Sequence, residues 1–144
     1  MKNITCLIII LCFFSACTKN ESTPTVASTL TVVDSTLIGS GSSIIATGNF
    51  MNGVHPVSGK ASWHIAGNSQ TLLLSNFSSD GGPDLKVYLS KDLAASSFIT
   101  LGDLKSTTGN QTYNIPSGAS TADYKYILIW CQRFSVLFGS ARIQ

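Results

Sequence analysis

Short strand-like runs, separated by turn-forming residues and without a helical period, constrain the fold of this chain more than any other feature. In KASWHIAG, Ala61, Trp63 and Ile65 are expected on one face of a strand, and the polar residues between them on the other. This alternation places His64 on the solvent-facing side. DLKVYLS alternates in the same way, with Leu85, Val87 and Leu89 facing inward.

Two other runs, QTLLLSNF and YKYILIW, are apolar at consecutive positions, which is typical of strands covered on both faces. Turn signals rich in Gly, Asn, Asp and Ser lie between the runs, as in MNG, AGNS, SSDGGPD and TTGN. We therefore predict an all-β fold, either a single β-sandwich or a closed β-barrel of short antiparallel strands.

Length and charge limit the possible functions. The 144 residues are enough for one domain, and a content of 44% hydrophobic and 11% charged residues allows a true core. The formal net charge is +2, and the Lys and Arg residues are scattered singly. No basic stripe is available to bind a phosphate backbone, so nucleic acid is excluded as the expected partner.

The N-terminus has the layout of an export signal. Lys2 precedes an apolar run that is too short to span a bilayer, and the run ends in FSAC, which resembles a bacterial lipobox. We predict a signal peptide at residues 1–16 and lipidation of the Cys17 thiol. Phe14 is bulkier than the usual lipobox residue, so an ordinary secretory signal cut nearby remains the alternative.

Residues 17–29 are polar, contain Pro24 and are predicted to form a flexible tether, which leaves residues 30–144 as the domain. The lipid on Cys17 would hold the protein on a membrane. Thr18 follows the lipidated position, as in lipoproteins that are sent to the outer membrane. We expect the protein in the bacterial cell envelope, on the outer membrane, at its periplasmic or its external face.

Cys131 is the only cysteine left in the predicted domain, because Cys6 and Cys12 leave with the signal and Cys17 is lipidated. Two interpretations stay open. A buried cysteine usually behaves as a small hydrophobe, but a free thiol outside the cytoplasm is exposed to oxidation and invites a chemical role. Arg133, predicted on the same strand and face, could activate it.

Metal sites are not expected. One cysteine and His55, which lies in a turn, do not make the four-ligand set of a structural zinc site. Asp80 and Asp84 flank two glycines but lack the alternating carboxylates of a calcium loop, so this stretch is interpreted as a tight turn. A Cys131–His55 nucleophile pair is conceivable, although no third orienting group is evident in the sequence.

Four segments together resemble a known family, the DM-thirteen domain, a small extracellular β-domain often found beside DOMON cytochrome-like domains. They are GNFMNGVHPVSG, LLLSNFSSDGGPDLKVYLS, LGDLKSTTGNQTYNIP and ILIWCQRFSVLFGSA, in that order. The resemblance implies extracellular electron transfer, with Cys131 as a bare redox thiol or as the ligand of a prosthetic group, Trp130 next to it and His55 at the histidine position of the family. A haem would be held noncovalently, because Cys-x-x-Cys-His is absent.

Three functions follow as hypotheses. The first is an envelope lipoprotein with a redox role through Cys131, dependent on a redox protein partner and not a self-sufficient enzyme. The second is an envelope binding module in which Cys131 only packs the core. The third is a thiol hydrolase or transferase, for which the sequence offers no base or oxyanion loop.

Overall fold

The computed structural model describes Ile38 and residues 41–144. The predicted signal peptide, the lipidated Cys17 and the tether lie outside the described residues. The compact unit that contains the domain runs from Val32 to Gln144. Among the described residues, no helix is long and apolar enough to cross a membrane.

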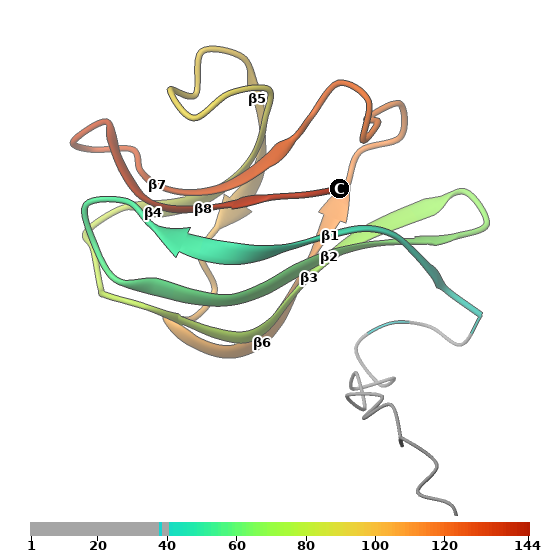
Figure 1. Ribbon diagram of the computed structural model, residues 1–144, viewed down its shortest axis with the longest axis horizontal. Coiled ribbons are helices and arrows are strands. Elements are labelled where there is room, and N and C mark those ends of the chain that lie inside the picture. Colours follow the sequence, from blue (N-terminus) through green and yellow to red (C-terminus); the bar gives the residue numbers. More distant parts are fainter. Residues whose placement is uncertain (1–37, 39–40) are drawn as a thin grey trace, which may run out of the picture. The chain divides into compact units, whose positions relative to one another are not determined.

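The described chain is all-β, as predicted (Figure 1). Its eight strands are β1 (Ser43–Asn52), β2 (Val57–Ala66), β3 (Ser69–Ser79), β4 (Leu85–Ser90), β5 (Phe98–Asp103), β6 (Thr108–Ile115), β7 (Tyr126–Cys131) and β8 (Val136–Arg142).

One sheet contains all of these strands, in the order β5-β4-β7-β8-β1-β2-β3-β6, and every pairing is antiparallel. The sheet curls until its edge strands β5 and β6 approach each other without forming a hydrogen-bonded ladder. Of the two architectures expected from the sequence, the structure is therefore the barrel, and it is nearly closed. The curled sheet can be followed in Figure 1.

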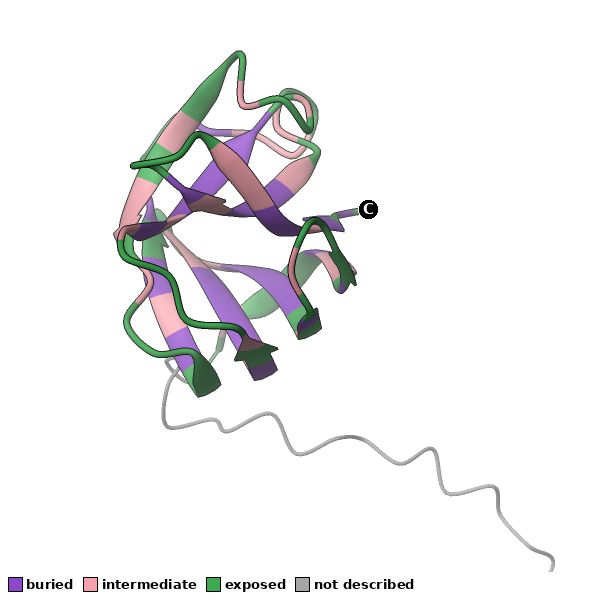
Figure 2. Ribbon diagram, turned by 90° about the vertical axis from the view of Figure 1, so that its left-hand side faces the viewer, coloured by how far each residue is buried: buried purple, intermediate pink, exposed green. Residues whose placement is uncertain are grey.

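The core lies inside this curled sheet, and Figure 2 shows the buried segments along the strands. Trp63 is its largest fully buried side chain, and the indole N–H donates a 2.7 Å hydrogen bond to Gln70 Oε1, so its polar atom is satisfied. Phe50 and Phe77 meet edge to face with their ring centroids 5.3 Å apart. These contacts join β1, β2 and β3 into one packed wall.

The predicted alternation is confirmed for most of the inward-facing residues, but Ile65, expected on the inner face, is only half-buried and lies outside the core cluster. Ala61 and Trp63 of β2 are fully buried, and the apolar positions of β4 point into the same core. The consecutive apolar runs in β3 and β7 are also buried on both faces, as expected. The three leucines Leu72–Leu74 and the run Ile127–Ile129 are all at most 1% exposed.

The prediction that His64 lies on the protein surface is wrong. Only 4% of His64 is exposed, although its neighbours on β2 show that it points away from the core. Burial lowers the pKa of His64 from its ordinary value by desolvating the charged form. Alternation along a strand assigns a side chain to a face, but it does not say whether that face is covered.

Two glycines let the β1–β2 turn and the start of β2 approach β8 closely. A Cβ on Gly139 would lie 2.5 Å from Val57 Cβ, and a Cβ on Gly53 would lie 2.3 Å from the Leu137 carbonyl oxygen. Without these side chains, the Gly53 N–H donates a 2.7 Å hydrogen bond to the Phe138 carbonyl. The turn between β1 and β2 is thereby held against β8, at the end of the barrel where the candidate site lies.

Candidate functional site

Cys131 is the last residue of β7, and its side chain lies in the core. Its cross-strand partners are Leu85 on β4 and Val136 on β8. The residue is 0% exposed, and no described residue forms a hydrogen bond with its sulfur. The thiol is therefore sealed among apolar side chains in this conformation, although the β7–β8 turn begins at the very next residue.

Arg133 does not continue the strand, contrary to expectation. β7 ends at Cys131, and Arg133 lies exposed in the turn that leads to β8. The strand ends here because residues 132–135 form the turn, with Ser135 in a left-handed conformation at a φ of 53°. Arg133 therefore does not share a strand face with the thiol.

Phe138 and the loop at Gly82 cover this end of the core. Phe138 is buried on β8, and a Cβ built on Gly82 would lie 2.9 Å from its Cζ and 2.8 Å from Leu85 Cδ2. The loop backbone thus rests on Phe138 and on the residue paired with Cys131. Glycine at position 82 suits this close approach, because a Cβ there would require the side chains of Leu85 and Phe138 to shift.

His55 closes the same end from the β1–β2 turn. Its ring stacks on Phe138, with the centroids 3.9 Å apart, and its Nδ1 lies 3.2 Å from Asp80 Oδ2. The His55 backbone N–H also points to the Phe138 carbonyl, at 3.4 Å. Both side chains of the His55–Asp80 pair are partly exposed, so the pair orients the ring but adds little stability.

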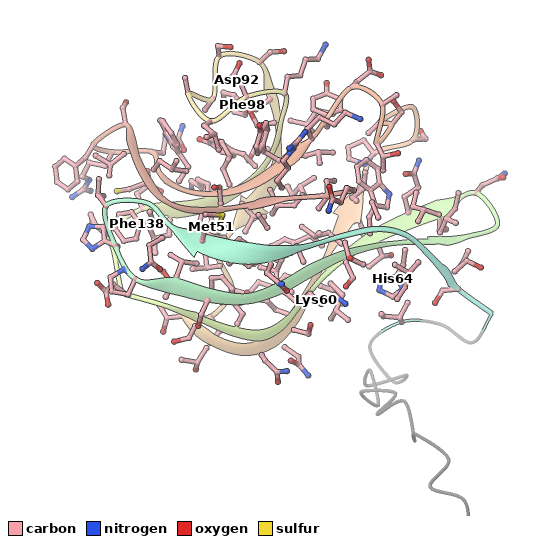
Figure 3. The ribbon with its side chains drawn as sticks, viewed as in Figure 1. Met51, Lys60, His64, Asp92, Phe98 and Phe138 are labelled. Carbon is pink, nitrogen blue, oxygen red and sulfur yellow. The ribbon has the colours of Figure 1, made fainter. Side chains whose placement is uncertain are left out.

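These residues form what we call the barrel-end cluster, and they come from three distant parts of the chain. Its members are His55, Asp80, Gly82, Leu85, Cys131 and Phe138. Figure 3 shows Phe138 at the end of the barrel where β1 turns into β2. The structure thus brings the predicted site residues Cys131 and His55 to the same end, where Phe138 contacts the histidine and shares the core with the cysteine.

Sequence reasoning missed Phe138, Gly82 and the pairing of His55 with Asp80. The two adjacent glycines in SSDGGPD were a usable signal, because one of them permits a close approach that a turn alone does not need. The partners of these residues were not visible in the sequence. The stack of His55 on Phe138 joins residues 83 positions apart.

Trp130 lies on the opposite face of β7 from Cys131. Its ring is stacked 6.3 Å from Tyr88, which in turn stacks at 4.1 Å on Phe98, and none of the three belongs to the core cluster. Burial raises the pKa of the Tyr88 hydroxyl. Trp130 and Cys131 therefore cannot line one side of the same ligand.

A charged group lies beside this aromatic row. Lys86 on β4 has its ammonium hydrogen-bonded to Asp103, and it also lies 2.9 Å from Asp84. The two carboxylates raise the pKa of Lys86 above its ordinary value. Asp84 thus pairs with Lys86 two residues further along, on the strand that it precedes, and its carbonyl accepts a 2.9 Å bond from the Gln132 N–H, which ties the loop to the β7–β8 turn.

The residues around Cys131 do not fit a haem. The sulfur has no open space beside it, Trp130 faces away, and one face of the His55 ring is covered by Phe138. One hollow, of about 260 Å³, lies elsewhere, between β1, residues 121–125 and residues 142–144. In the described part of the chain, no three His, Cys, Asp or Glu residues are grouped so that they could hold a metal ion.

Comparison with known proteins identifies the family. Residues 49–143 match the family model described as Electron transfer DM13, which lies within the predicted domain and covers every member of the barrel-end cluster. No curated protein and no solved structure matched the chain.

Proposed function

Because the chain belongs to the Electron transfer DM13 family, we propose that it is an envelope lipoprotein that passes electrons through the thiol of Cys131. One observation supports the proposal most strongly. Segments around residues 55, 82 and 138 meet at the end of the barrel that holds the only cysteine of the domain. Lipid on Cys17 would keep this domain at the outer membrane, on its periplasmic or external face.

The seal over the thiol is compatible with this role. A buried sulfur is protected from small oxidants that would convert it irreversibly to sulfinic or sulfonic acid. The cover is thin, because Cys131 ends its strand and its partner Val136 is only half-buried. Strand ends and loops open at lower free energy than the core as a whole, so a local opening can present the thiol to a partner.

A single thiol can relay electrons between a dithiol and a disulfide. The Cys131 thiolate, its proton lost to solvent, attacks the disulfide of an acceptor protein; one sulfur–sulfur bond forms, one breaks, and an acceptor thiolate leaves. A thiolate of a donor dithiol attacks the sulfur of Cys131 in this mixed disulfide and releases the reduced acceptor. The second donor thiol then frees Cys131, so two electrons and two protons pass from donor to acceptor.

The thiol relay is tested by incubating the native full chain with oxidised glutathione. We expect a mixed disulfide on Cys131 under conditions where the protein stays folded, measured by mass spectrometry and by peptide mapping. Cys131→Ser is the matched control and should remain unmodified in the domain. An adduct that forms only after denaturation would contradict the relay.

The lipid anchor is tested separately by metabolic labelling with a clickable fatty acid in a bacterial host. We expect the unaltered chain to be labelled and Cys17→Ser to be unlabelled. An unlabelled wild-type chain would remove the anchor from the proposal and leave the domain chemistry unaffected.

A second candidate function is an envelope binding module in which Cys131 only fills the core. The full burial of the sulfur and the absence of a hydrogen bond from any described residue favour this alternative. It predicts that a purified Cys131→Ala protein stays folded and supports the same envelope phenotype as the unaltered chain. A null phenotype with a folded protein would favour the thiol relay instead.

A further inference from the structure

His64 is buried without a hydrogen-bond partner. Only 4% of the residue is exposed, and neither ring nitrogen has a partner. A buried polar group that lacks a hydrogen bond is destabilising by roughly 1–3 kcal/mol, so such groups are rare in folded proteins. Something other than simple core packing must account for this imidazole, because it points away from the core.

Other side chains on the outward face of β2 and β3 are covered as well. Ser62 is 3% exposed and Leu73 is 1% exposed, and neither belongs to the core cluster that contains their neighbours in the sequence. The outward face of a single sheet contacts solvent unless another element lies on it. The strands do not provide this cover, since Ile44, the β1 residue paired with His64, is 49% exposed.

Ile38, in the chain that leads into β1, is itself buried. It lies five residues before β1, and His64 pairs with the second residue of that strand. Figure 3 shows His64 at the end of the sheet where β1 begins.

We propose that the outward face of β2 and β3 around His64 is the docking site for residues 32–37 of the same chain. The segment VVDSTL is long enough, because six extended residues span about 20 Å, or four strand spacings. It offers apolar side chains to cover Leu73, and hydroxyl and carboxylate oxygens that can accept a bond from an imidazole. The domain then begins with a bound lead-in, and only the chain before it acts as a tether.

The proposed docking site is separate from the barrel-end cluster. β1 starts at the end of the sheet where His64 lies, whereas the β1–β2 turn with His55 is at the other end. The proposal does not depend on any reaction of Cys131.

Hydrogen–deuterium exchange on the full chain tests the docking directly. We expect the amides of residues 33–37 to exchange at least ten-fold more slowly than those of residues 19–28. Leu37→Asp should abolish this protection, and it should move the NMR titration of His64 back towards that of an ordinary histidine. Thr25→Asp places the same charge in the tether and is the matched control, which should change neither measurement.

The exchange experiment on the unaltered chain decides the matter even where Leu37→Asp fails to fold. Equal exchange rates for residues 33–37 and 19–28 would overturn the proposal. Protection that increases with protein concentration would also overturn it, because the face would then be covered by a second copy of the chain.

Discussion

Cys131 and His64 are two buried residues in contrasting surroundings, at opposite ends of the sheet. Cys131 points into the core among apolar side chains, and the loop at Gly82 rests on its cross-strand partner Leu85 and on Phe138. His64 points outward and is just as inaccessible, but both of its ring nitrogens lack a partner. Burial of the thiol among apolar side chains carries no electrostatic penalty, whereas burial of an imidazole without hydrogen-bond partners is unfavourable.

This contrast shows that accessibility depends on the cover over a residue and not on the direction in which it points. Cys131 is surrounded by described residues: its cross-strand partners are Leu85 and Val136, and Phe138 belongs to the same core cluster. The cover over His64 is not supplied by the strands beside it, as the exposure of Ile44 shows. Removing each cover should therefore have different consequences, and the predictions that follow are ordered by the size of the expected effect.

Phe138→Ala should produce the largest effect. The substitution removes a buried ring that packs beneath the loop at Gly82 and under His55, so we expect unfolding to become easier by about 3–5 kcal/mol. Phe134→Ala is the matched control, because Phe134 is 65% exposed in the neighbouring turn, and its effect should stay within about 0.5 kcal/mol. Chemical denaturation measures both, and equal losses would show that Phe138 does not cover the core.

Gly82→Ala should be next, with a loss of roughly 1–3 kcal/mol, since its methyl group must displace Leu85 or Phe138. Gly81→Ala has no atom within 4 Å of the added carbon and serves as the control. The same pair should differ in the native reactivity of Cys131, which a displaced loop would increase. Indistinguishable variants in both measurements would argue against the loop as a cover.

The pH dependence of stability reports on His64. Burial lowers the pKa of His64 in the folded state below its ordinary value of 6.5. The contribution of His64 to the free energy of unfolding is therefore fully present above pH 6.5. This contribution is lost as the pH falls below that value, by at most about 1.4 kcal/mol per pH unit. No charged residue pairs with His64 across β1 or β3, where its partners are Ile44 and Thr71, and Lys60 is the charged residue on its own strand. His64→Leu should flatten this part of the stability profile between pH 7 and 5. A profile unchanged by His64→Leu would show that the imidazole is solvated.

His55→Ala should have the smallest effect on stability, below about 1 kcal/mol, because both side chains of the His55–Asp80 contact are partly exposed. The variant should nevertheless increase thiol reactivity, since it uncovers one face of Phe138. Asp80→Asn keeps the His55 ring stacked on Phe138 and only weakens the hydrogen bond between residues 80 and 55. It should therefore change the reactivity of the thiol less than His55→Ala does. The reverse order of reactivity would mean that the charge, and not the stacked ring, protects the thiol.

Local pattern was sufficient to predict the strand class and most of the inward residues, although Ile65 at the end of β2 is only half-buried. Alternation placed Ala61 and Trp63 correctly, and continuous apolar runs identified the leucines of β3 as buried on both faces. These features depend on neighbours two residues away, which a sequence displays directly. Closure of the barrel depends on which strands pair, and this information is not contained in any one segment.

The candidate site was predicted only in part for the same reason. The sequence singled out Cys131 and His55, but their common position follows from the register of β1 against β8 and of β4 against β7. The end of β7 at Cys131 moved Arg133 into a turn and left Trp130 on the opposite face of the strand. His64 was misplaced because strand alternation contains no information about an element that packs on the outer face.

The accessibility of the Cys131 thiol in native protein, measured as a function of denaturant, tests the central claim most directly. The rate of reaction with a disulfide reagent, divided by that of an unfolded thiol, gives the free energy of the opening that exposes the sulfur. A local opening of the barrel-end cover predicts a free energy well below that of global unfolding, with a weak dependence on denaturant. An opening free energy equal to that of global unfolding, with the same denaturant slope, would contradict a redox role and leave Cys131 as core.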